Sequence, residues 1–222
     1  MWSLLRVPWT RLARSPRSLL TLLPWACIAL FFGWTARGRG ADDSLATYAA
    51  LPLPLLAFAA VGAVLGAKSL GHAVSGLRAL GASRPAAILA HFLAAVILSM
   101  VLTAVVGGAV AALAHGPADP PLARDVLASA GASALGGAAY AGLFLLGATF
   151  GNGAGRSIVL AIDFAFGGSS VGAMLFPRGH VRSLFGGADV AELTARQSSI
   201  ALPVLAALFL LLAFLRTRRP AR

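Results

Sequence analysis

Six long apolar runs make up most of this 222-residue chain and constrain its fold more than any other feature. The runs cover residues 18–36, 47–67, 86–114, 126–150, 157–176 and 199–215. An α-helix needs about 20 predominantly apolar residues to cross the hydrocarbon core of a bilayer, and every run is near or above that length. Since one soluble core of this size could not bury six such segments, we expect an all-α polytopic membrane protein with six transmembrane helices in one domain, residues 1–222.

Composition and charge agree with a membrane protein. Hydrophobic residues make up 59% of the chain and charged residues 11%, whereas a typical soluble domain has about 25% charged residues. The net charge of +11 would also suit a nucleic-acid-binding protein. However, the Arg residues flank the apolar runs and form no basic cluster interleaved with aromatic residues. We therefore expect contact with membrane lipid and no nucleic-acid partner.

Basic residues are concentrated in alternate gaps between the apolar runs. Twelve lie in the two terminal segments and the second and fourth gaps: Arg6, Arg11, Arg14, Arg17, Lys68, Arg78, Arg84, Arg156, Arg216, Arg218, Arg219 and Arg222. Six lie in the opposite gaps, together with six acids: Arg37, Arg39, Arg124, Arg178, Arg182, Arg196, Asp42, Asp43, Asp119, Asp125, Asp189 and Glu192. Because cytoplasmic loops carry an excess of Lys and Arg, both termini are predicted to lie in the cytoplasm. The dominance of Arg over Lys indicates a bacterial protein, and we place it in the inner membrane.

The N-terminal segment predicts an interfacial helix over residues 1–16. Trp2, Leu5, Trp9 and Leu12 recur every three or four residues, so they would share one face, with Arg side chains mostly elsewhere. A disordered basic leader is the alternative. The first apolar run is too long for the core of a signal peptide and no A-x-A site follows it. We therefore interpret that run as a membrane span.

The gap after the second run predicts a short cytoplasmic helix over residues 69–84. Four apolar side chains at offsets of four, three and three share one helical face: Leu70, Val74, Leu77 and Leu80. Gly81 is typical of a helix C-terminus, and Pro85 lies just beyond it. We interpret this face as an apolar stripe that a soluble partner could cover.

Asp163 is the one acid inside an apolar run. An ionisable group in lipid is costly, so it normally pairs with another group or marks a functional path. Arg156 lies seven positions earlier, on nearly the same helical face, and is the candidate partner. Two interpretations stay open: Asp163 anchors a helix contact, or it lines a pathway and relays a proton.

Signals for catalysis and for metal binding are weak. Residues 62–69 nearly match a phosphate-binding P-loop, but Ala67 stands where the motif requires Gly before the Lys at position 68. The four His residues are scattered, with no pair at i and i+4. We therefore expect no catalytic residue, no metal site and no ATPase activity in this chain, which is not predicted to be an enzyme.

The order of these elements and one short stretch carry a resemblance to a known family. The stretch Gly76-Leu-Arg-Ala-Leu-Gly-Ala-Ser-Arg84-Pro85 looks like the coupling loop of several ABC permease groups. The whole layout resembles the type-2 ABC transporter permeases, and its plan is similar to that of the haem-exporter permease. Residues 177–198 would then match the external re-entrant region before the last span.

The resemblance implies both a partner and a mode of action. The helix between the second and third spans would dock on a separate nucleotide-binding ATPase subunit, which binds the ATP and Mg²⁺. The permease would work as a dimer with an identical or a different second permease subunit. The residues that this resemblance assigns to docking are Leu70, Val74, Leu77, Arg78, Leu80 and Arg84.

Three functions are therefore considered for this chain. The first is the permease subunit of an ATP-driven exporter. The second is a non-transporting membrane scaffold or anchor for a soluble partner, which the same short helix would hold. The third is a secondary carrier that uses Asp163 and a proton gradient.

Overall fold

The structure, a computed structural model, describes residues 7–10, 12–13, 15, 20–38, 40–66, 69–150, 153–168 and 171–218. Its helices are α3 (Leu23–Thr35), α4 (Ala41–Ala50), α5 (Pro52–Leu65), α6 (Leu70–Ala79), α7 (Arg84–Ala114), α8 (Leu122–Gly147), α9 (Gly155–Phe166), the 3-10 helix η1 (Val171–Leu175), α10 (Pro177–Leu184) and α11 (Ala195–Arg218). The only β-type pairing among these described residues is an isolated bridge between Val190 and Leu193. The all-α prediction is thus confirmed.

Four stretches are long and apolar enough to cross a membrane: Arg84–Ala114, Leu122–Gly147, Ala195–Arg218 and Pro52–Ala79. The last of these runs over both α5 and α6 and includes residues 67–68, which lie outside the described residues. A multi-pass membrane protein is therefore supported, with four candidate spans in place of the six expected. Of the predicted interfacial helix, the structure describes residues 7–10, 12–13 and 15, and residues 7–10 are helical.

Three of the six apolar runs form helices that are each shorter than a span, and in the second run the longest helix, α5, has 14 residues. In the run 18–36, α3 has 13 residues. In the run 157–176, α9 has 12 residues and ends at Phe166, while η1 begins at Val171. At 1.5 Å per residue, α9 is about 18 Å long, well short of a bilayer core of about 30 Å. Six crossings therefore remain a prediction.

The second apolar run begins inside α4 and continues through α5. The break between the two helices falls at Leu51, whose φ and ψ of −134° and −61° are not helical. Pro52 and Pro54 follow immediately. Because Pro lacks an N–H and disfavours a helical conformation in the residue before it, the pair explains why a new helix starts here.

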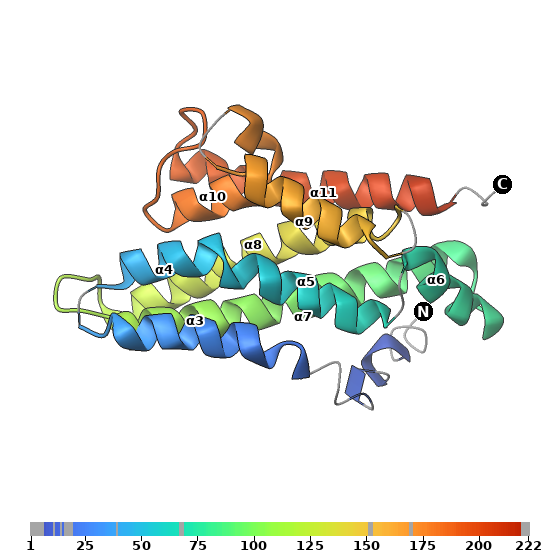
Figure 1. Ribbon diagram of the computed structural model, residues 1–222, viewed down its shortest axis with the longest axis horizontal. Coiled ribbons are helices and arrows are strands. Elements are labelled where there is room, and N and C mark those ends of the chain that lie inside the picture. Colours follow the sequence, from blue (N-terminus) through green and yellow to red (C-terminus); the bar gives the residue numbers. More distant parts are fainter. Residues whose placement is uncertain are drawn as a thin grey trace.

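Helices α7 and α8 form the centre of the bundle and pack closely against each other. Helices α3 and α5 cover α7, while α11 covers α8. In Figure 1, α3 lies along the lower edge and α11 along the upper edge, with α7 and α8 between them. Two glycines allow the central contact: Gly107 of α7 faces the Ser133 side chain, and Gly137 of α8 faces Thr103 and the Ser99 carbonyl. Small residues at such positions let membrane helices approach closely.

A buried polar network reinforces the centre of the bundle. The Tyr48 hydroxyl of α4 donates a 2.8 Å hydrogen bond to the carbonyl of Thr103 on α7. The Thr103 hydroxyl in turn contacts the carbonyl oxygen of Ser133 on α8, at 2.8 Å. All three side chains are buried. These bonds link α4, α7 and α8 inside the bundle, where buried polar groups need internal partners.

The outside of the bundle is strongly apolar. Large hydrophobic side chains on the long helices are exposed, among them Val101, Val105, Leu127, Ile200 and Val204. In water such a continuous apolar surface would favour association, whereas lipid tails would cover it without cost. The exposed surface therefore agrees with a membrane setting.

Acidic side chains gather at one end of the bundle, and α6 lies at the other (Figure 1). Asp125 lies in the first turn of α8, whereas α6 is bonded to the other end of α8, where the Leu70 N–H donates to the Ala148 carbonyl at 3.0 Å. At the Asp125 end, the carboxylate of Asp119 accepts 2.9 Å bonds from the backbone N–H groups of Ala41 and Gly116. Which end faces the cytoplasm remains a prediction.

Candidate functional site

Helix α6 corresponds to the short helix predicted over residues 69–84. The Ser69 side chain accepts a 3.3 Å hydrogen bond from the His72 N–H and so caps its N-terminus. After the helix ends at Ala79, Gly81 adopts a φ of +87°, a conformation that favours glycine. Helix α6 lies at the right-hand end of the bundle in Figure 1, beside the start of α7.

Three of the four residues of the predicted apolar stripe of α6 are covered by the chain itself. Leu70, Val74 and Leu77 are at most 3% exposed and belong to the main hydrophobic core. This corrects the prediction that a soluble partner could cover the stripe. The physical reason is that α6 folds back onto the start of α7, which buries the apolar face within one chain.

A different set of residues faces outward from α6, here called the outer face of α6. It comprises Gly71, His72, Ser75, Gly76, Arg78, Ala79 and Leu80. Leu80, just after the helix ends, is 70% exposed and is the one large apolar side chain of this face. Arg84, at the start of α7, is partly exposed. Of the six docking residues expected from the sequence, Arg78, Leu80 and Arg84 are thus accessible to a partner.

Asp163 is completely buried and contacts groups from two other helices. Its Oδ2 accepts a 2.9 Å hydrogen bond from the Tyr140 hydroxyl of α8, and its Oδ1 accepts a 3.4 Å bond from the backbone N–H of Arg178 on α10. The Arg178 side chain donates to the Phe164 carbonyl at 2.9 Å, and its guanidinium carbon lies 4.5 Å from the Phe164 ring centroid. The carboxylate therefore fixes α9 to α8 and to the start of α10.

Arg156 and Asp163 do not form the pair that the sequence suggested. The guanidinium carbon of Arg156 lies 5.2 Å from the centroid of the Phe58 ring on α5. Its Nε and Nη1 atoms are buried without a hydrogen-bond acceptor in the part of the chain that the structure describes. Arg156 thus faces α5, while Asp163, two turns later, faces α8.

Tyr140 and Arg178 are the partners of Asp163 that sequence reasoning missed. They lie 23 and 15 positions from Asp163, on separate helices. The sequence offers no signal for such pairing, because side-chain contact at these separations depends on how α8, α9 and α10 pack. One clue existed: a buried carboxylate requires donors, and Tyr140 is the one tyrosine in the fourth apolar run.

A second cluster not expected from the sequence lies at the end of the bundle remote from α6. Ligand atoms of His115, Asp119 and Asp125 lie within 4.8 Å of one another. The Nδ1 atom of His115 lies 3.4 Å from an oxygen of Asp125. One oxygen of Asp119 already accepts the two backbone bonds that close the loops of this end. The cluster is thus explained as a loop-closing contact between the end of α7 and the start of α8.

The described geometry therefore offers three features with functional potential: the outer face of α6, the enclosed Asp163 contact and the unpaired guanidinium of Arg156. The first projects from the end of the bundle, whereas the other two lie between helices. Comparison of this chain with protein-family models and with curated proteins found no match.

Proposed function

We propose that this chain is the permease subunit of an ATP-driven exporter of the type-2 ABC class in the bacterial inner membrane. A separate nucleotide-binding ATPase subunit would hold the ATP and Mg²⁺, and a second permease subunit, identical or different, would complete the assembly. The observation that carries the proposal is α6, a capped helix at the end of an apolar bundle with one face packed on its own chain and the other free.

The contacts of α6 suit a lever that transmits movement into the membrane. Its buried side chains pack on the start of α7, and the Leu70 N–H is bonded to the Ala148 carbonyl at the end of α8. Helix α7 runs for 31 residues, about 46 Å at 1.5 Å per residue. A displacement of α6 would therefore act on both central helices, which pack closely along their length.

The mechanism requires a partner whose affinity for α6 differs between two states of the permease. ATP binding would draw two ATPase subunits together, and each would move the α6 that it holds. The docking surface of the proposal is the outer face of α6, with Leu80 as an apolar anchor and Arg78 as a cation for an acidic group of the ATPase. The buried stripe would keep α6 rigidly attached to its own bundle.

Co-purification tests the docking surface. The chain would be co-expressed with an ATPase encoded beside it, carrying either Leu80→Asp or Arg78→Glu on the outer face of α6. Leu122→Asp and Arg124→Glu are matched controls, because these residues are exposed at the opposite end of α8. We expect both α6 variants to lose the ATPase and both controls to retain it. An intact complex with full ATP turnover in both α6 variants would contradict the proposal.

The scaffold function rests on the same outer face of α6, because a partner can bind there without any transport. ATP hydrolysis stimulated by a transported substrate separates the two, since a scaffold would show none. The proton-coupled carrier is less favoured. Asp163 is completely buried, and both of its oxygens accept hydrogen bonds from neighbouring helices, an arrangement that suits a helix contact.

A further inference from the structure

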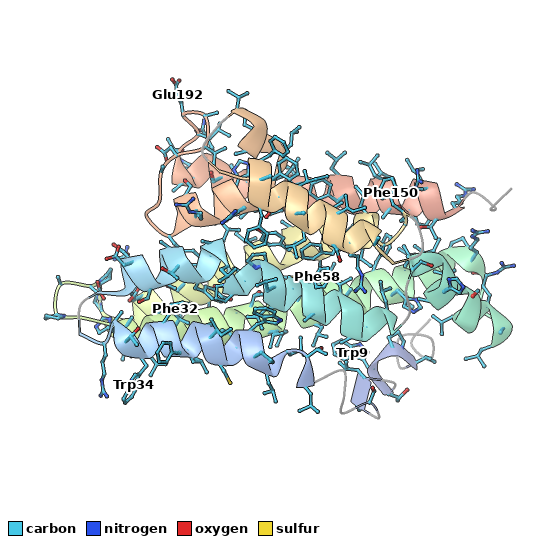
Figure 2. All side chains as sticks on the ribbon, in the orientation of Figure 1. Trp9, Phe32, Trp34, Phe58, Phe150 and Glu192 are labelled. Atoms are coloured by element: carbon cyan, nitrogen blue, oxygen red, sulfur yellow. The ribbon has the colours of Figure 1, made fainter. Side chains whose placement is uncertain are left out.

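A cavity of about 610 Å³ opens between α3, α5 and α9. Its walls are mainly apolar and aromatic, with Trp25 from α3, Leu55 and Phe58 from α5 and Leu160 from α9. The polar part of the lining is Thr21, just before α3, and Arg156 and Ser157 at the start of α9. Pockets of this size, with apolar walls and few convergent polar groups, are typical small-molecule sites. In Figure 2, Phe58 lies on the part of α5 that faces α9.

The charge in this cavity lacks a counter-ion among the described residues. Nε and Nη1 of Arg156 are buried and have no acceptor there, and the guanidinium lies over the face of Phe58 and beside Gly62. A cation removed from water without a partner is costly, and within a membrane such a group usually pairs or marks a binding path. The guanidinium fork matches the oxygens of a phosphate or carboxylate.

Gly62 gives the guanidinium its position. A Cβ atom at residue 62 would lie 2.8 Å from Nη1 of Arg156. Glycine at this place on α5 therefore leaves the space into which the charged end of the side chain reaches. The arrangement combines an anion-binding group with a long apolar wall, and these are the two parts of an acidic amphiphile.

We propose that this cavity binds an anionic phospholipid, with the phosphate on Arg156 and Ser157 and an acyl chain against Trp25, Leu55 and Phe58. A free phosphate would use the cation and leave the apolar wall uncovered, so a lipid fits the lining better. Basic pockets between membrane helices are known to hold acidic headgroups. The site does not depend on the proposed transport function, and a scaffold or carrier with this fold would contain it equally.

Fluorescence quenching by brominated lipid tests the site, because Trp25 lines the cavity. The full chain would carry Trp25 as its only tryptophan, with Trp2, Trp9 and Trp34 replaced by Phe. A second version would keep only Trp34, which is exposed at the far end of α3 and points away from the bundle in Figure 2. Each version is titrated in micelles with brominated phosphatidylglycerol, brominated phosphatidylcholine, or phosphatidylglycerol with inorganic phosphate as competitor.

We expect phosphatidylglycerol to quench Trp25 at about tenfold lower concentration than phosphatidylcholine, and both lipids to quench Trp34 alike. Equal quenching of Trp25 by the two lipids would overturn the proposal. This test leaves Arg156 and Gly62 unchanged. Displacement of the lipid by inorganic phosphate at concentrations too low to screen charge would also overturn it, because the site would then be one for a free anion.

Three substitutions then assign the preference to the guanidinium. Arg156→Gln removes the charge, and Gly62→Ala keeps the charge but displaces it, so both should abolish the preference for the anionic lipid. Arg218→Gln removes an exposed charge near the end of α11 and should leave the preference unchanged. Retention of the tenfold preference in a folded Arg156→Gln or Gly62→Ala variant would count against the assignment. The circular dichroism spectrum of each variant shows whether it is folded.

Discussion

The Tyr140 hydroxyl donates a 2.9 Å hydrogen bond to the buried carboxylate of Asp163 and thereby joins α8 to α9. Helix α9 is short and begins where its residue Gly155 approaches Gly147 at the end of α8. Its attachment involves this bond, the Gly contact, and both the backbone bond and the side-chain contacts of Arg178. The contact holds helices together, so the effect of removing it can be measured as a change in the free energy of unfolding.

Replacement of Tyr140 by Phe should lower the free energy of unfolding by about 1–3 kcal/mol, because a buried acceptor would lose its donor. Asp163→Asn should cost less, since the amide oxygen can still accept the bond from Tyr140. Unfolding by titration with a denaturing detergent in mixed micelles measures both. If Asp163→Asn abolished proton-driven transport while stability stayed unchanged, the carrier function would replace the structural interpretation.

The sequence predicted the elements that local signals determine and missed those that depend on packing. The spacing of Leu70, Val74 and Leu77, with Gly81 beyond them, indicated a helix where α6 lies. The spacing could not tell whether this chain or a partner covers the stripe, because the two cases require the same pattern. Hydropathy likewise extended the fifth run to residue 176, although α9 ends at Phe166, since apolar residues continue through η1.

Because Leu77 is buried and Leu80 is exposed, the two leucines should contribute unequally to the stability of the protein. Leu77→Ala should destabilise the protein by about 2–5 kcal/mol, because it leaves a cavity in the core. Leu80→Ala should change stability by no more than about 0.5 kcal/mol, since an exposed side chain loses few contacts. Thermal unfolding in one detergent compares the two variants. Equal losses would show that the stripe is not packed on the chain as described.

Because α7 and α8 pack closely, substitution by Ala should affect stability differently at two glycines of α8. A Cβ at Gly137 would meet the Thr103 hydroxyl and lie 2.8 Å from the Ser99 carbonyl oxygen, so Gly137→Ala must push α7 and α8 apart. Such overpacking typically costs about 1–3 kcal/mol. Gly131 is exposed on the same helix, and a Cβ atom built there would have no neighbouring atom within 4 Å.

Gly131→Ala is therefore the matched control, and it should raise stability by up to about 1 kcal/mol because alanine favours the helix more than glycine. Both variants are measured by unfolding in the same detergent. A neutral Gly137→Ala would mean that the two central helices do not approach as closely as this contact requires.

The orientation of the bundle in the membrane can be tested with cysteine labelling. Cys27 is the only cysteine of the chain, so Cys27→Ser gives a background without thiols. Into it are placed Ser75→Cys, on the outer face of α6, or Arg124→Cys, which is exposed at the opposite end of α8. A maleimide that cannot cross membranes is added to intact cells and then to cells made permeable.

Since cytoplasmic segments carry the excess of Arg and Lys, we expect the cysteine at position 124 to react in intact cells. The cysteine at position 75 should react only after permeabilisation. The reverse pattern would place α6 outside the cell, where no cytoplasmic ATPase could reach its outer face. The exporter proposal would then fail, whereas the phospholipid site would stand, because the cavity between α3, α5 and α9 is independent of the direction in which the bundle is inserted.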